Sequence, residues 1–542
     1  PSSPRPQMRI ARVRRPRASR FPDVGRSWPA AFGSLLLASS LWAGAAFAEG
    51  AGALQFEIRE FQVGGATLLD AGTIKQVLAP HAGPRREFGD LERALQALRA
   101  AYAARGYRGV VVRLPEQELD AGVVRIAVVE PFVESVDVVP PPFFDPQRLR
   151  QSFPMLEPGQ PIDFDRLGHA LDVVNENPAL KAAVEILPGA REDLRRVRIV
   201  GTGEDPLTRF VSLDDTGTAA TGRRRIGVGL RHADISGRFD TLTAQYVVSA
   251  EKPSAASFWG LGYRLPVPEQ SLAIDAYVGH SDVSSGTVAG LFDVAGKGTV
   301  AGARVALSLD RIGAYRHQLA AGIDYRDFRN RVTFGGGASL VPDYTVHPLS
   351  VAYSGEIGTT TFALTAVHGF PGGSRSDDAT LAQARLGADA HYLLWRFNAS
   401  HAEPVGSGWL VRAAVSGQQA RNPLVPGEQF GLGGAQSVRG FDERQIAGDT
   451  GTRVGLELHG PGQVLGGAEV KPLAFVDYGE LRRNQAQPGE LAREAIASWG
   501  IGARMQLPRQ FALSVDAARV QHGTASQAAG RGRLHVALQV NF

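Results

Sequence analysis

Cysteine is absent from all 542 residues, and this absence removes two classes of structure. No disulfide framework can form, and no zinc site with thiolate ligands is possible. A chain without thiols suits passage through an oxidising compartment. Beyond residue 48 the sequence also lacks any run of about 18 consecutive apolar residues, so we do not expect a helical membrane protein.

Catalytic signatures are missing as well. In GLFDVAGKG, Gly290 to Gly298, the spacing differs from that of a phosphate-binding loop, and a glycine replaces the magnesium-binding Ser or Thr. GLGGAQ, Gly431 to Gln436, lacks the third glycine of a dinucleotide-binding turn. The 12 histidines are scattered, and neither a nucleophile elbow nor a zinc-protease motif occurs. We therefore expect no enzymatic activity, no cofactor and no metal site.

The formal net charge of +4 is concentrated at the start of the chain. Residues 1–48 hold eight arginines, no lysine and one acidic residue, which gives +7 and leaves −3 for the remainder. The basic character therefore belongs to this leader, and it does not indicate a nucleic-acid partner.

The leader has the pattern of a secretory signal peptide. A basic stretch precedes the apolar run AAFGSLLLASSLWAGAAF, and Ala46-Phe47-Ala48 forms a cleavage motif of small residues. A transmembrane anchor is the alternative, but glycine and serine dilute the run and no basic flank follows it. We predict a signal peptide over 1–48 with cleavage after Ala48, followed by a short N-terminal segment, 49–54.

The next part of the sequence has the pattern of two α+β units in tandem. In the first unit, strand-like FEIREFQV precedes a helix with Asp90 as N-cap and Gly106 as stop, and two apolar strands follow. In the second, the strand VESVDVV precedes a helix that begins at Asp163 and ends before Asn177-Pro178, and two more strands follow. Each unit thus offers an amphipathic helix to cover a small sheet.

These units resemble POTRA domains, the periplasmic modules that precede outer-membrane barrels of the assembly and secretion superfamily. The order strand, helix, helix, strand, strand fits, as do Gly106-Tyr107 after the long helix and Asn-x-x-Pro in VVNENPAL. Any other two-layer α+β domain would show the same periodicity, and this alternative stays open. We place the first POTRA unit at 55–131 and the second at 132–201.

After Pro206 the helical period disappears and strict alternation takes over. TLTAQYVVS, SLAIDAYVG and FALSVDAA each place apolar residues on one face and polar or small residues on the other, as membrane-crossing strands do. A soluble β-sandwich would alternate too, but short connections here alternate with long ones such as 328–345, which is typical of outer-membrane barrels. We count about 16 strands, one of them starting near Asp389, and predict a transmembrane antiparallel β-barrel over 206–542.

The final strand, LHVALQVNF, alternates in the same way. Its apolar residues from Leu534 to Phe542 share one face, and His535 lies on the other. In Gram-negative outer-membrane proteins, a terminal aromatic on such a strand resembles the signal that the barrel-assembly machinery reads. We therefore expect Phe542 to be an assembly signal, that machinery to be a partner during biogenesis, and outer-membrane lipid to surround the barrel.

One long connection, 419–452, has an unusual composition, because LGGAQSVRGF holds a valine, an arginine and a phenylalanine between glycines. An arginine in a surface loop is most often simply solvated. The chain also resembles, over nearly all of 56–542, the two-partner secretion transporters of the haemolysin secretion/activation type. In that family the sixth loop folds into the lumen and carries a Val-Arg-Gly-Phe or Val-Arg-Gly-Tyr tip. The resemblance implies that Val438, Arg439, Gly440 and Phe441 form this tip.

The same family has a strand motif, Phe-x-Asp-x-Gly, whose acid pairs with the loop arginine. Here the motif is Phe475, Asp477 and Gly479 in AFVDYGE. Alternation independently places these residues on one face, so Asp477 should point into the lumen. We predict a charge-assisted pair with Arg439, which the fork of the guanidinium allows to be bidentate, and we expect it to fix the inward loop and help gate the conduit.

The resemblance implies an outer-membrane translocator whose periplasmic POTRA domains capture a large secreted β-helical exoprotein for export through the barrel. The client would be haemagglutinin-, haemolysin- or adhesin-like. The alternative is a barrel assembly or insertion factor of the same superfamily, although such factors usually carry more than two POTRA units. A passive porin would leave residues 55–200 without a role.

The start of the chain departs from the family pattern. Family members commonly carry an N-terminal helix that plugs the barrel, yet only residues 49–54 separate the predicted cleavage site from the first domain. Either loop six acts alone in this chain, or the predicted cleavage site is wrong.

Overall fold

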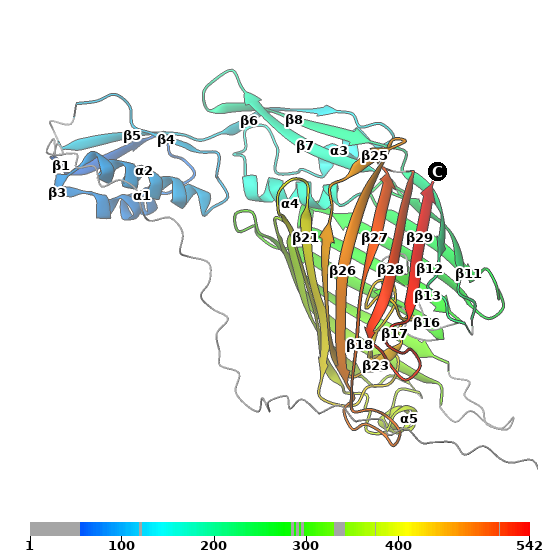
Figure 1. The fold of residues 1–542 in the computed structure, drawn as a ribbon. Coiled ribbons are helices and arrows are strands. Elements are labelled where there is room, and N and C mark those ends of the chain that lie inside the picture. The colour runs from blue at the N-terminus through cyan, green and yellow to red at the C-terminus, as the bar shows by residue number, and fades with distance from the viewer. Residues whose placement is uncertain are drawn as a thin grey trace, which may run out of the picture. The chain divides into compact units, whose positions relative to one another are not determined.

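The structure is a computed structural model that describes most of the chain beyond residue 54 (Figure 1). The described residues are 55–118, 122–219, 221–282, 287–288, 292–293, 297–329, 342–373, 375–508 and 510–542. The predicted signal peptide, its cleavage site at Ala48 and the segment 49–54 lie outside these residues. No helix in the described ranges is long and apolar enough to cross a membrane.

The first α+β unit has a three-stranded sheet in the order β2-β5-β4, in which β2 and β5 are parallel and β4 is antiparallel. Its core is apolar, with Leu98 and Val112 fully buried. The Tyr102 hydroxyl donates to Glu130 at 2.8 Å. Burial, and then this hydrogen bond, raise the pKa of Tyr102. The elements are β1 (Phe56–Ile58), β2 (Glu60–Gly64), α1 (Ala71–Leu78), η1 (Ala79–His81), β3 (Gly83–Arg86), α2 (Phe88–Ala103), β4 (Val111–Arg113) and β5 (Val123–Val129).

Helix α2 begins earlier than the sequence pattern suggested. Its first residue is Phe88, and Asp90 lies inside the first turn, where its carboxylate accepts the Glu87 N–H at 3.0 Å. The ring of Phe88 packs edge-on against Phe56, with the centroids 5.4 Å apart. Asp90 was the wrong N-cap: the cap is Glu87, and Asp90 is the third residue of the helix, where it closes a capping box with Glu87.

The second α+β unit repeats the topology of the first. Its sheet has the order β6-β8-β7, with β6 and β8 parallel and β7 antiparallel. Asp163 is the N-cap of α4, as expected, and its carboxylate accepts the N–H groups of Asp165 and Arg166 at 3.1 and 3.0 Å. The elements are β6 (Phe132–Val139), α3 (Pro146–Gln151), α4 (Phe164–Asn175), β7 (Leu180–Pro188) and β8 (Leu194–Gly203).

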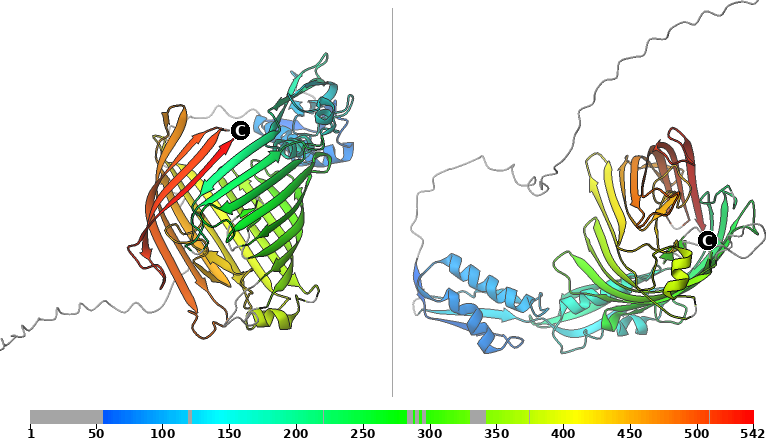
Figure 2. Two further views of the ribbon diagram at one scale, coloured as in Figure 1. Left: turned by 90° about the vertical axis from the view of Figure 1, so that its right-hand side faces the viewer. Right: turned by 90° about the horizontal axis from the view of Figure 1, so that it is seen from below.

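The rest of the chain is a closed antiparallel β-barrel in which β29 pairs with β9 (Figure 2). Sixteen strands form the wall, and the three-residue strand β25 (Gln463–Leu465) adds only to the end of β26. The predicted strand number is therefore confirmed. The wall consists of β9 (Leu207–Asp214), β10 (Arg225–His232), β11 (Thr241–Ser249), β12 (Ser257–Val267), β13 (Leu272–Ser281), β16 (Gly298–Ser308), β17 (Arg316–Phe328), β18 (Tyr344–Ile357), β19 (Thr360–Phe370), β20 (Leu393–Pro404), β21 (Leu410–Ala420), β24 (Thr450–His459), β26 (Ala468–Arg482), β27 (Arg493–Leu507), β28 (Phe511–His522) and β29 (Gly532–Asn541).

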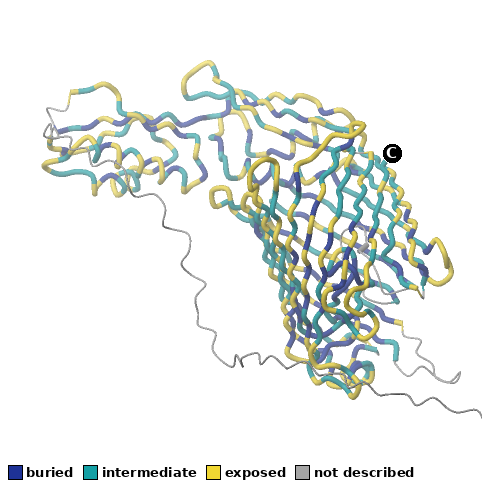
Figure 3. Tube along the Cα trace, in the orientation of Figure 1, coloured by how far each residue is buried: buried dark blue, intermediate teal, exposed yellow. Residues whose placement is uncertain are grey.

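Apolar side chains cover the outside of the barrel, and polar ones face the lumen. Strand β26 illustrates the alternation, because Phe475 and Asp477 are buried whereas Val476 and Tyr478 are exposed. Figure 3 shows buried and exposed positions alternating along the wall. Since an apolar exterior is stable only in lipid, the barrel has the surface of a membrane protein.

The connections differ at the two ends of the barrel. Short links such as η2 (Pro268–Gln270) lie at one end, and the longer links lie at the other. The fifth long link contains α5 (Asp378–Ala384), after which Ala388, Ala390 and Tyr392 join an apolar cluster with Leu381. Strand β20 begins at Leu393, and the predicted start near Asp389 was wrong because Ala388 and Ala390 pack into this cluster. Tyr392, which joins the cluster too, accepts one bond from Gly369 of β19 at 2.9 Å.

The first short turn of the barrel is seated in the second α+β unit. Phe239 is buried in the core of that unit, where its ring lies edge-on to Phe144 at 6.0 Å. The Asn177 amide donates to the carbonyls of Ala233 and Phe239 at 2.5 and 3.0 Å. In the same turn, burial raises the pKa of Asp234. The short turns therefore lie at the end of the barrel that faces the α+β units.

Candidate functional site

The sixth long connection, residues 421–449, folds back into the barrel, and the view along the barrel in Figure 2 shows this part of the chain within the ring of strands. It contains a hairpin of β22 (Phe430–Leu432) and β23 (Ile446–Gly448). Val438 and Phe441 are completely buried and cluster with Leu481 and Val520 of the wall. The two apolar residues of the predicted tip thus pack against the inner surface of the barrel.

Arg439 lies between these apolar residues and reaches Asp477 on β26. Its Nε donates to Oδ2 at 2.7 Å and its Nη2 donates to Oδ1 at 2.9 Å, so the pair is bidentate. The Arg439 backbone N–H also donates to Oδ2, at 3.2 Å. Only 2 per cent of Arg439 and none of Asp477 is exposed. The structure therefore brings together the two residues that were paired from the sequence.

The other members of the wall motif contribute as well. The guanidinium carbon of Arg439 lies 3.4 Å from the centre of the Phe475 ring, which is a cation–π contact. At Gly479, a Cβ would lie 2.8 Å from Leu432 and 3.1 Å from Val438, closer than side chains tolerate. Phe475 thus packs its ring against the guanidinium of Arg439, and Gly479 leaves space for the loop.

The structure adds partners that the sequence pattern did not identify. Glu457 on β24 accepts from Nη1 of Arg439 at 2.8 Å, and Asp516 on β28 lies 3.9 Å away. Behind the arginine, the Gly440 N–H donates to Nε2 of His535 at 2.9 Å. Alternation had placed His535 on the polar face of the last strand, but sequence alone could not pair it with a loop that lies about 95 residues earlier. The tip therefore contacts β24, β26, β28 and β29.

A charged cavity of about 580 Å³ lies beside the tip. Three arginines from separate strands, Arg412, Arg453 and Arg504, line it together with Glu457 and Asp516. Within the described ranges, no three His, Cys, Asp or Glu side chains are grouped so as to hold a metal ion. Charges of both signs are therefore spread over the wall of this cavity.

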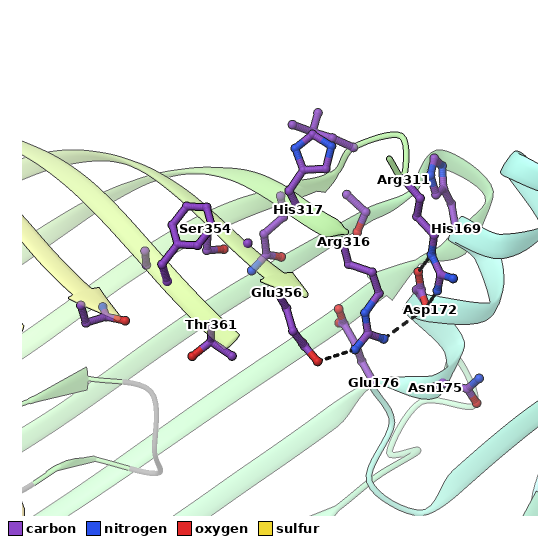
Figure 4. Close-up of a pocket in the computed structure, with 17 residues that line it drawn as sticks. His169, Asp172, Asn175, Glu176, Arg311, Arg316, His317, Ser354, Glu356 and Thr361 are labelled. Atoms are coloured by element: carbon purple, nitrogen blue, oxygen red, sulfur yellow. Dashed lines mark hydrogen bonds and ion pairs between the residues drawn. The ribbon is translucent and has the colours of Figure 1, made fainter. Parts of the chain in front are cut away.

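A second cavity, of about 550 Å³, lies where α4 meets the short-turn end of the barrel (Figure 4). Asp172 of α4 accepts from Nε of Arg311 at 2.8 Å and lies 3.7 Å from Arg316. Arg316 also pairs with Glu356 at 2.7 Å, and Figure 4 shows these side chains converging between the helix and the strands. Ion pairs thus hold α4 beside this end of the pore.

Phe542 lies at the seam that closes the barrel. Its N–H donates to the carbonyl of Arg209 at 2.8 Å, and the Arg209 N–H returns a bond at 3.2 Å. Its side chain is 70 per cent exposed, which makes the ring accessible on the outside of the molecule.

Comparison with known proteins identifies the family of this chain. Residues 195–505 match the sequence model of the haemolysin secretion/activation protein family ShlB/FhaC/HecB, and residues 56–131 match the ShlB-type POTRA domain. The chain belongs to this family. Because the first match covers more than half of the chain, the secretion transporter is favoured over the assembly factor of the same superfamily.

Several relatives are transporters. Outer membrane transporter CdiB of Escherichia coli is 25% identical over 418 residues, which cover 74% of this chain and 68% of the relative. CdiB of Dickeya dadantii (strain 3937) is 23% identical, with coverages of 82% and 79%. The heme/hemopexin transporter protein HuxB of Haemophilus influenzae (strain ATCC 51907 / DSM 11121 / KW20 / Rd) is 18% identical, with coverages of 82% and 80%.

Solved structures show the same fold. CdiB from Escherichia coli superimposes with a TM-score of 0.75 at 21% identity, covering 92% of this chain and 93% of that chain. CdiB from Acinetobacter baumannii gives a TM-score of 0.66 at 17% identity, with 91% of each chain covered.

The ShlB/FhaC/HecB assignment fixes compartment and orientation. This family member is a two-partner secretion transporter of the outer membrane, with its POTRA units in the periplasm. The short turns are therefore periplasmic and the long loops extracellular. A transporter of this kind works with a secreted partner protein.

Proposed function

We propose that this transporter exports one large secreted partner, a β-helical exoprotein of the haemagglutinin, haemolysin or adhesin kind, as an unfolded chain through its barrel. The observation that carries the proposal is the buried Arg439–Asp477 pair, which holds a long loop inside the lumen. A loop fixed there narrows the conduit, and in this proposal it leaves the lumen when a client passes.

The POTRA units supply the capture step in this proposal. In the described residues β7 pairs only with β8. Asn175 and Asn177 occupy the start of its other edge at Ala182 and Leu180, so the rest of that edge, towards Ile186, is left for strand addition. Such an edge can pair with an extended segment of a client by strand addition. Folding of the client outside the cell would then drive transport, since no nucleotide motif was found in the sequence.

Biogenesis completes the proposal. We infer that the signal peptide 1–48 directs the chain to the periplasm with cleavage after Ala48, and that the barrel-assembly machinery reads Phe542. The exposed ring of Phe542 at the seam supports this role. The proposed domain boundaries remain 55–131 and 132–201 for the POTRA units, and 206–542 for the barrel.

Deletion of the gene tests the export function. We expect one large protein to disappear from the culture medium while the levels of other outer-membrane proteins stay unchanged. A general loss of outer-membrane proteins would instead indicate an assembly factor, and swelling of liposomes in neutral solutes without a lost exoprotein would indicate a porin.

Arg439→Ala and Asp477→Ala test the role of the loop. Each variant leaves a buried charge without its partner, so we expect reduced secretion and altered channel conductance. The matched control is Glu480→Gln on β26, the strand of Asp477; it removes a charge from an exposed pair with Arg493 on β27. Wild-type secretion and conductance in both loop variants would refute the role.

A further inference from the structure

Glu428 is a second buried charge in the inward loop, and its partners lie on wall strands that Arg439 does not contact. None of its surface is exposed. Its Oε1 accepts from Nη1 of Arg326 on β17 at 2.8 Å, and its Oε2 accepts from Nη2 of Arg396 on β20 at 3.1 Å. One carboxylate thus joins two wall strands that are not neighbours.

The surroundings of Glu428 hold this geometry. Gln418 on β21 donates to the Glu428 carbonyl at 2.9 Å and accepts from Nε of Arg396 at 2.9 Å. Asp324 accepts from Nη2 of Arg326 at 2.7 Å. Both carboxylate oxygens and the carbonyl of Glu428 therefore have donors from the wall.

The residue before Glu428 shows how closely the loop follows the wall. A Cβ on Gly427 would lie 2.2 Å from the Phe328 ring, so only glycine fits. The Gly427 N–H donates to the Tyr344 hydroxyl at 3.1 Å. Backbone and side-chain contacts thus reach the wall at the same point.

The two charged contacts of the loop lie on different parts of the barrel. Along the order β17, β18, β19, β20, β21, β24, β26, the strand of Asp477 lies six steps from that of Arg326 and three steps from that of Arg396. The loop is therefore held at two separate parts of the wall, one through Glu428 and one through Arg439.

The charges around Glu428 stabilise its contact with Arg326 and Arg396. Near Glu428 the wall presents Arg326 and Arg396 against Asp324, so without Glu428 this part of the wall carries an excess of positive charge. A buried carboxylate between two guanidinium groups is stable only while both remain, because desolvated charges need their partners.

We propose that Glu428 is a positioning residue that clamps the base of the loop to β17 and β20, independently of the Arg439 anchor at the tip. This inference rests on the proposed function, in which the loop moves during transport. Breaking the tip anchor alone lets the tip swing about Glu428. The loop leaves the lumen only when both anchors are broken.

The absence of cysteine makes a direct test possible in the full-length protein in lipid vesicles. Spin labels are placed at Gln436→Cys, an exposed position near the loop tip, and at Ser407→Cys, in an exposed periplasmic turn. The distance distribution between them reports the displaced fraction of the loop. It is measured in the labelled parent, in Glu428→Gln, in Arg439→Ala and in the double variant.

We expect each single variant to raise the ratio of displaced to docked loop, and the double variant to raise it by about the product of the single effects, because the free energies of independent anchors add. An increase of at least about tenfold in the double variant over Arg439→Ala corresponds to about 1.4 kcal/mol. Glu480→Gln serves as the charge control and should leave the distribution unchanged.

The outcomes separate the inference from the proposed function. If Glu428→Gln leaves the distances unchanged both alone and with Arg439→Ala, the inference is wrong. If the loop is displaced but secretion stays at wild-type level, the anchor is supported and the gating role of the loop fails. Should Glu428→Gln fail to fold, Arg396→Gln removes one half-exposed partner and must shift the distances in the same direction.

Discussion

The α+β units and the barrel place their apolar side chains in opposite ways. In the units, Leu98 and Phe153 are completely buried. In the barrel, Leu456 and Val476 are more than half exposed on the outer face, while charged residues such as Asp477 are buried. Apolar packing therefore stabilises the units, and lipid and ion pairs stabilise the barrel.

This difference separates stability from function. Packing in the units is close and local, so truncation there should lower the free energy of unfolding. Inside the barrel the structure depends on which charge meets which partner. A conduit for a polypeptide needs such a polar interior, and the same ion pairs that satisfy buried charges can also hold a movable loop.

The largest effect is expected from a core truncation in the second unit. Phe153→Ala should cost about 3–5 kcal/mol, because it removes a ring from a closed apolar core. Protease protection of this unit in the intact protein measures the loss. Phe143→Ala is the control, since that ring is 68 per cent exposed in the same unit. Equal effects of the two substitutions would contradict the packing difference.

A charge placed on the lipid-facing surface tests the exterior of the barrel. Leu456→Arg places a charge near the middle of the lipid-facing wall and should cost about 2–4 kcal/mol, falling to about 0–1 kcal/mol near the interfaces. Urea titration of the barrel in lipid vesicles measures this cost. Leu465→Arg, at an exposed position in the periplasmic hairpin of β25, should have little effect. A similar cost at both positions would mean that Leu456 does not face lipid.

An intermediate effect is expected where the two regions meet. Asn177→Ala removes two donors to buried carbonyls of the first periplasmic turn and should cost about 1–3 kcal/mol. Hydrogen exchange at Ala233 to Phe239 measures the loosening of the turn. Gln147→Ala, at an exposed position in the same unit, is the control. If hydrogen exchange in Asn177→Ala is unchanged, Asn177 does not stabilise the contact between the second unit and the turn.

The smallest effect belongs to the exposed ion pairs of α4. Arg311→Ala should cost about 0–1 kcal/mol, because both partners are partly solvated. Salt should reduce this difference, since screening weakens exposed pairs. Thermal unfolding at low and high ionic strength checks it, with Arg191→Ala, in an exposed pair within the unit, as control. A cost that does not change with salt would contradict a solvated pair.

Sequence periodicity was sufficient for the wall of the barrel but not for what fills it. Each strand has one face in the lumen and one in lipid, so apolar and polar residues alternate along it. This alternation is visible in the local sequence, and the strand number followed from it. The Arg439–Asp477 pairing came from strand parity and the family motif together. Glu428 was missed because its partners, Arg326 and Arg396, lie on separate strands, and only the closed barrel brings them to one point.

Local patterns also failed where a distant contact decided the structure. Strand β20 starts late because Ala388 and Ala390 pack around α5, and this packing leaves no signal in the adjacent residues. Such errors concentrate where loops and termini meet other elements, because there the partner residue is far away in the sequence. The start of α2 is different, because its capping box of Glu87 and Asp90 is local and was overlooked.

The seating of Phe239 in the neighbouring unit has an evolutionary consequence. Phe239, in a turn of the barrel, packs inside the core of the second POTRA unit, so this core contains a side chain from each part. Recombination that exchanged this unit between relatives, without also exchanging the turn, would leave a ring without its pocket. The second unit and the barrel should therefore have diverged together.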